Sequence, residues 1–158
     1  MTLETKSTLT DATIDKLQDL IQINIDSVHG LTDAANAMED SVVADLFRQI
    51  ASDRRSFASE LQMYVSWNGE DCCCEGESLA AKVHQTWMNL RAKLNGGDTH
   101  VVLIEAERGE DHIKEAYETA LKENPGSAVS EILHSQYAVV KAGHDRIRDL
   151  RDAYADRK

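Results

Sequence analysis

Apolar residues recur every three or four positions along most of this chain, which is the spacing of helices that bury one face. The first such segment predicts a helix over about 12–38, begun by Thr10 or Asp11, and the second predicts a helix over 41–67 that ends at the turn-forming pair Asn68 and Gly69. The predicted inward line of the first helix consists of Leu17, Ile21, Asn24, Val28, Leu31, Ala35 and Met38.

Three more helices are predicted in the second half of the chain. Ser78 begins a shorter one that carries Trp87 and ends at about residue 94, before a run of Asn and two Gly. Asp98 precedes a long helix over 98–123, the sequence NPG at 124–126 interrupts the chain, and Ser127 begins the last helix. The pattern therefore predicts four long helices and one short helix.

The lengths of the connections predict how these helices are joined. Only a few residues separate the first two long helices, or the last two, so each pair must form an antiparallel hairpin. The middle connection is long enough to run the length of a bundle and contains the short helix. Hairpin, long crossover and hairpin is the ferritin-like order, so we predict an all-α, ferritin-like four-helix bundle over residues 12–156, preceded by a flexible segment over 1–11.

Composition and charge narrow the range of functions. The chain has 158 residues and a net charge of −11, which disfavours nucleic acid and anionic membrane surfaces as partners. No apolar run is long enough to span a membrane and the N-terminus does not resemble a signal peptide, so a cytoplasmic location is expected. The three cysteines are consecutive at 72–74, which is neither a disulfide framework nor a zinc-ligand spacing.

Candidate chemistry lies in the last two helices. Glu107 and Glu110 are three residues apart, so they share one face of their helix, and His144 follows the inward Gly143 in the last helix. Carboxylates with an imidazole suit iron or manganese. Gly109 is unusual in mid-helix and indicates close packing or room for something else.

These residues resemble a known pattern. AERGED at 106–111 with Tyr117 resembles the third-helix motif of rubrerythrin-like proteins, and HDRIRDL at 144–150 resembles their fourth-helix pattern. DRRSFA at 53–58 resembles the second-helix block, in which the family has an acid followed by a histidine. Over most of residues 12–152 the chain looks like a family of small bacterial ferritin-like bundles with no assigned function.

The resemblance implies a di-metal site, but this chain departs from the ligand pattern. Ser56 or Phe57 stands where the second-helix histidine is expected, and Lys141 stands where an acid should precede His144. The remaining candidate metal ligands are Glu107, Glu110, His144 and Asp53. The site is interpreted as degenerate, holding one metal ion or none.

Each candidate also has a purely structural interpretation. Glu107 and Glu110 would pair with Lys114 or Arg108 on a partly solvated flank, and His144 would hydrogen-bond to a neighbouring helix. Asn24 and Gln136 interrupt the inward lines, and since buried amides require partners they are expected to form a polar layer that fixes helix register, paired with Asp53, Arg54 or each other.

Two functions remain open from the sequence. The favoured one is a non-catalytic interaction or structural protein, with a stress-related role, no cofactor, an unidentified protein partner and a homodimeric state. The alternative is a non-haem iron or manganese protein with oxidase- or peroxidase-like activity, using Glu107, Glu110 and His144.

Overall fold

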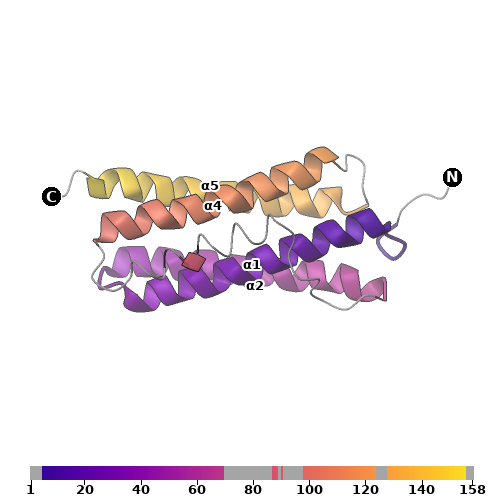
Figure 1. Ribbon diagram of the computed structural model, residues 1–158, viewed down its shortest axis with the longest axis horizontal. Coiled ribbons are helices and arrows are strands. Elements are labelled where there is room, and N and C mark those ends of the chain that lie inside the picture. Colours follow the sequence, from indigo (N-terminus) through magenta and orange to yellow (C-terminus); the bar gives the residue numbers. More distant parts are fainter. Residues whose placement is uncertain (1–4, 70–86, 89, 91–97, 124–127, 156–158) are drawn as a thin grey trace.

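The computed structural model describes residues 5–69, 87, 88, 90, 98–123 and 128–155, and these residues form four long helices. They are α1 (Asp11–Ala37), α2 (Ser41–Trp67), α4 (Thr99–Glu123) and α5 (Ser130–Ala155) (Figure 1). The described residues contain no strand, so the prediction of an all-α protein with four long helices is confirmed. The predicted short helix lies outside the described residues except for Trp87, Met88 and Leu90.

The helix ends follow the capping signals of the sequence. The Thr10 side chain accepts a hydrogen bond from the Thr13 N–H, and the Asp40 side chain accepts from the first turn of α2. After α2, Gly69 adopts φ +76°, the left-handed conformation that glycine enters without steric penalty. Ser127, the predicted start of the last helix, lies outside the described residues.

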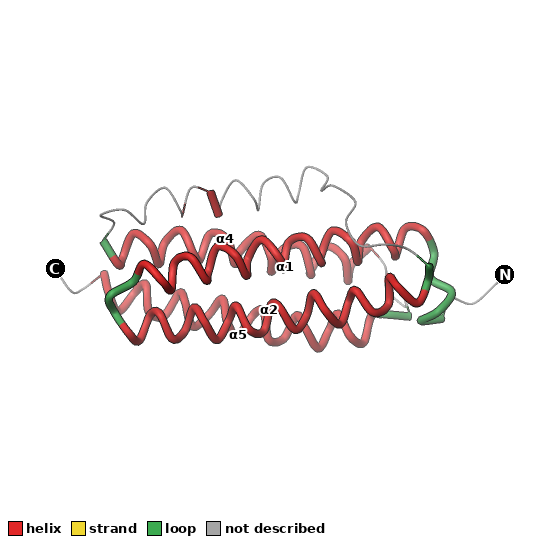
Figure 2. The backbone as a smooth tube through the Cα atoms, turned by 90° about the horizontal axis from the view of Figure 1, so that it is seen from below, coloured by secondary structure: helices red, strands yellow, loops and turns green. Residues whose placement is uncertain are grey.

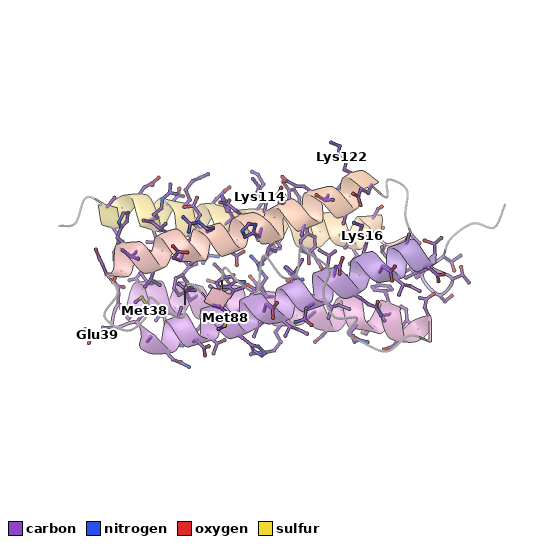
Figure 3. The ribbon with its side chains drawn as sticks, viewed as in Figure 1. Lys16, Met38, Glu39, Met88, Lys114 and Lys122 are labelled. Atoms are coloured by element: carbon purple, nitrogen blue, oxygen red, sulfur yellow. The ribbon has the colours of Figure 1, made fainter. Side chains whose placement is uncertain are left out.

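The four helices pack side by side, each antiparallel to its neighbours. The α1–α2 and α4–α5 hairpins lie against each other so that α1 adjoins α4 and α2 adjoins α5 (Figure 2). Lys16, near the start of α1, pairs with Glu123 at the end of α4 at 2.6 Å, and Figure 3 shows Lys16 beside that end of α4. Tyr154 of α5 donates a hydrogen bond to Asp40 at the start of α2. Consequently α4 begins at the end of the bundle opposite to the end of α2.

The interior between the helices is filled by apolar side chains from all four. Leu17, Phe47, Leu103 and Val140, one from each helix, are fully buried. Burial of a side chain of this size stabilises the fold by about 1.5–3 kcal/mol, so the shared interior holds the two hairpins together.

Trp87 explains the glycine in the middle of α4. Its buried indole lies between α1 and α4, where a Cβ on Gly30 would come within 2.4 Å of the ring and a Cβ on Gly109 within 2.6 Å. Both distances are below any van der Waals contact, so each helix needs a glycine there for the ring to fit. Of the two meanings expected for Gly109, close packing is the one that the structure supports.

The side chain of Asn68 holds the segment before α1 against the end of α2. Asn68, which follows α2, accepts a hydrogen bond from the Leu9 N–H at 2.8 Å and donates to the Lys6 carbonyl at 3.0 Å, so residues before α1 pack on the end of α2. Among the described residues, no helix has the length and apolar content needed to cross a membrane.

Candidate functional site

The centre of the bundle contains a buried ion pair between α2 and α4. Arg54 and Glu110 both have side chains with 0% exposure, and the Arg54 Nη2 donates to Glu110 Oε2. Ser27 of α1 donates to the other carboxylate oxygen at 3.3 Å. Because Arg54 Nε and Nη1 have no hydrogen-bond partner among the described residues, Glu110 provides the main compensation for this buried charge.

A chain of hydrogen bonds crosses the bundle next to this pair. Asn24 of α1 donates from Nδ2 to the Tyr117 hydroxyl at 3.0 Å, and Tyr117 of α4 donates to Gln136 Oε1 at 2.6 Å. Gln136 of α5 then donates from Nε2 to Glu60 of α2 at 2.8 Å. Asn24 and Gln136 thus belong to a polar layer that touches all four helices, as expected, but the predicted partners were wrong: Tyr117 and Glu60, rather than Asp53, Arg54 or each other, bind the two amides.

Burial controls the ionisation of the central hydroxyl. Removal from water disfavours the phenolate and raises the pKa of Tyr117 far above its usual value, although the hydrogen bond from Asn24 and the charge of Arg54 oppose the shift. Tyr117 therefore stays neutral at physiological pH and serves as both donor and acceptor in the layer.

A second cluster lies between α4 and α5. Glu107 and Asp111 are one helical turn apart on α4, and His144 faces them from α5. His144 Nε2 is 2.5 Å from Asp111 Oδ1 and 3.8 Å from Glu107 Oε1. Glu107 and His144 are buried, whereas the Asp111 side chain is 56% exposed, so the cluster reaches from the interior to the surface.

Charged neighbours on α5 surround this cluster. His144 Nδ1 is 3.1 Å from Asp145 Oδ1, and this hydrogen bond, with help from Arg148, lowers the pKa of Asp145. Arg148 contacts Asp145 at 3.3 Å and Lys141 contacts it at 3.8 Å. Arg151 donates to Glu107 Oε2, so the other oxygen of that carboxylate faces His144.

The structure separates the four predicted ligands. It brings Glu107 and His144 together, but it places Glu110 opposite Arg54 at the centre, and Asp53 belongs to neither cluster. Within the described chain, the only group of three or more potential ligands with atoms within 4.8 Å of one another is Glu107, Asp111 and His144.

Three residues of these two clusters were not predicted as site residues from the sequence. Asp111 was not among the predicted ligands, although its spacing of four from Glu107 places it on the same face of α4. Arg151 lies in a run of alternating charges, which is typical of a solvated helix end. Arg54 was expected only as a possible partner of Asn24 or Gln136. The expected partner Arg108 instead contacts Glu105 at 3.0 Å.

Fold and site together define a four-helix protein with a polar, ion-paired centre and a separate carboxylate–imidazole cluster. Residues 12–123 match a family described as a domain of unknown function (DUF2383), and the chain belongs to that family. The match includes Glu107, Glu110 and Asp111 and ends before α5, which carries His144. No curated protein and no solved structure matches the chain.

Proposed function

We propose that this protein is a non-catalytic, ferritin-like bundle that acts through its surfaces, with an ion pair at its centre in place of a di-metal site. The observation that carries this proposal is the fully buried pair of Arg54 and Glu110. A di-metal site needs several carboxylates that face one another, with the cations supplying the positive charge. Here a guanidinium supplies that charge to Glu110.

The helix arrangement supports the ferritin-like assignment. α2 ends beside the start of α1, and α4 begins at the far end of the bundle, so the end of α2 and the start of α4 are about the length of a 27-residue helix apart, roughly 40 Å. One long crossover between two hairpins is the feature that distinguishes ferritin-like bundles from simple up-and-down bundles.

Substitutions of Arg54 and Glu110 test whether this ion pair stabilises the fold, because the result depends on whether they lower or raise the free energy of unfolding. Replacing one partner of a buried ion pair leaves the other charge uncompensated, so Glu110→Gln and Arg54→Met should each lower the free energy of unfolding by about 3–5 kcal/mol. The double variant Arg54→Met/Glu110→Leu removes both charges and should be more stable than either single variant. Glu115→Gln, at an exposed position of α4, is the matched control.

A metal-ligating carboxylate would behave differently. Without metal, clustered ligand carboxylates repel one another, so neutralising one would leave stability unchanged or raise it. Urea unfolding of the metal-free variants distinguishes the two cases. A more stable Glu110→Gln variant, together with two iron or manganese ions per wild-type chain and oxidase turnover, would refute a structural centre.

A groove on the outer side of the α1–α2 hairpin supports the expectation of a homodimer. Its volume is about 600 Å³, and it includes Met63 and Trp67, whose exposures are 48% and 55%. The lining contains no acid and includes His29 and Arg55. For chains that each carry a charge of −11, this is a surface where two copies can approach with reduced repulsion.

The oligomeric state tests this surface. Sedimentation equilibrium should give a dimer for the wild-type chain and a monomer for Met63→Ser/Trp67→Ser. Val42→Ser/Val139→Ser, which alters exposed apolar residues outside the groove, should remain dimeric. A monomeric wild-type chain at micromolar concentration would exclude self-association through this groove.

A further inference from the structure

The cluster of Glu107, Asp111 and His144 has the composition of a small metal site. Its ligand atoms, two carboxylate oxygens and one imidazole nitrogen, lie within 4.8 Å of one another. Around a metal ion with bonds of about 2.1 Å, tetrahedral ligand atoms are roughly 3.4 Å apart. The widest separations in the group, up to 4.8 Å, would therefore shorten, and the 2.5 Å between His144 Nε2 and Asp111 Oδ1 would lengthen, each by about 1 Å. We propose that these three side chains bind a single divalent transition-metal ion between α4 and α5.

The hydrogen bonding of His144 favours this assignment over a chance meeting of acids. Metal-ligating histidines usually donate their second ring N–H to a carboxylate, which fixes the tautomer and orients the ring. Asp145, 3.1 Å from His144 Nδ1, is placed to accept that hydrogen bond. The Nε2 lone pair then faces Asp111 and Glu107, an arrangement that requires a proton or a metal ion between the nitrogen and the oxygens.

The neighbouring cations leave the ligand atoms accessible. Arg148 and Lys141 contact Asp145 rather than the three ligands. Arg151 donates to Glu107 Oε2, which holds this carboxylate in place while its Oε1 faces His144. Arg151 also lowers the negative charge around the three ligands. Selectivity among metal ions should therefore depend on the chemistry of the ligand atoms and not on charge alone.

Burial of the ligands fits a site that exchanges metal with solution. Glu107 and His144 are buried and held by hydrogen bonds to Arg151 and Asp145, so two ligands are already oriented. Asp111 contacts His144 at the surface and is 56% exposed, so it is the ligand that an ion entering from solvent would meet first. One imidazole with two carboxylates suits Zn²⁺, Mn²⁺, Fe²⁺ or Co²⁺ better than Mg²⁺ or Ca²⁺, which prefer oxygen ligands alone.

This site is distinct from the centre of the bundle. Glu110, which would be a ligand in a di-metal centre, forms an ion pair with Arg54 instead. The proposal therefore stands independently of the non-catalytic function, because a single ion between α4 and α5 leaves the Arg54–Glu110 pair in place.

Titration of the chelator-treated, full-length chain with Co²⁺ and Zn²⁺ tests the proposal. The three cysteines at 72–74 are replaced by serine throughout, because thiolates would compete for both ions. Excess Mg²⁺ is present to occupy unspecific sites on a chain of charge −11. Calorimetry should give one ion per chain, and the Co²⁺ spectrum should show nitrogen and oxygen coordination.

Variants assign the ion to these residues. Asp111→Asn keeps the shape of an exposed side chain and should weaken binding at least tenfold, and His144→Gln should do the same. Glu115→Gln, one turn further along α4 from Asp111, should bind as tightly as wild type. A saturating ion should also raise the melting temperature of the wild-type chain but not of Asp111→Asn.

Two results would overturn the proposal. One is the absence of Co²⁺ or Zn²⁺ binding in the presence of Mg²⁺. The other is unchanged affinity in Asp111→Asn and His144→Gln, which would place any bound ion elsewhere. Neither result would alter the test of the Arg54–Glu110 pair, since that test uses metal-free protein.

Discussion

The indole ring of Trp87 lies so close to Gly109 that a Cβ on this glycine would stand 2.6 Å from the ring. The same ring would meet a Cβ on Gly30 at 2.4 Å. A residue from the connection between the hairpins therefore fits between α1 and α4 only because both helices carry glycine at the point of contact.

Substitution of these glycines should destabilise the protein, against the usual trend. In an exposed helix interior, Gly→Ala raises stability by about 1 kcal/mol. For Gly109→Ala or Gly30→Ala, the clash with Trp87 should outweigh that gain and lower the free energy of unfolding by about 1–3 kcal/mol. Urea unfolding followed by tryptophan fluorescence measures both the stability and the displacement of the ring.

Gly143 provides the matched comparison for these variants. A Cβ there would lie 3.4 Å from Arg54 Nη2 and 3.6 Å from Ile50, which are ordinary contacts. Gly143→Ala should therefore be neutral or stabilising. Equal losses in all three alanine variants would show that the effect does not come from Trp87.

Tyr117→Phe should cost about 1–3 kcal/mol of unfolding free energy. Loss of the hydroxyl leaves Asn24 Nδ2 with only the Leu20 carbonyl and deprives Gln136 Oε1 of its donor, and buried polar groups without partners are expensive. Tyr137→Phe is the control, since its hydroxyl donates to Glu118 at an exposed position. A stability loss no greater than that of the control would remove the polar layer as a stabilising element.

Alkaline pH should destabilise the protein through the same hydroxyl. The pKa of Tyr117 is raised in the fold by burial, so its contribution is complete below the unfolded value of about 10 and is lost as pH rises above it. Tyrosinate absorbance should therefore show one tyrosine that titrates only when the chain unfolds. Tyr137 also titrates late, because its hydrogen bond to Glu118 raises its pKa to about 12. In Tyr117→Phe the fraction that titrates only on unfolding should disappear and the late titration of Tyr137 should remain, while in Tyr137→Phe the fraction that titrates on unfolding should persist.

Asn68 should anchor the segment before α1. Its side chain accepts from Leu9 N–H and donates to the carbonyls of Lys6 and Tyr64. Asn68→Ala should lower stability by about 1–2 kcal/mol and speed amide exchange at Leu9. Asn68→Asp retains the acceptor for Leu9 but loses both donated bonds, so exchange at Leu9 should stay slower than in the alanine variant.

Much of the fold could be predicted because its causes are local. Helix periodicity, the Thr10 and Asp40 caps and the glycine after α2 act within a few residues, so the observed helices begin and end close to the predicted positions. The short connections between α1 and α2 and between α4 and α5 require each pair to be antiparallel. The predicted short helix falls mainly outside the described residues, and the ferritin-like assignment stays a proposal.

The partners of the polar residues were decided only in three dimensions. A stripe of apolar residues identifies the inward face of a helix, but it does not fix how far the helix is rotated or shifted along its axis. A shift of one turn would give each polar residue a different partner. Arg54 and Glu110, 56 residues apart, and His144 and Asp111, 33 residues apart, meet because of those shifts. The sequence alone determined which residues carry charge on the inner faces; packing determined that Glu110 faces a guanidinium and that Glu107 faces a histidine.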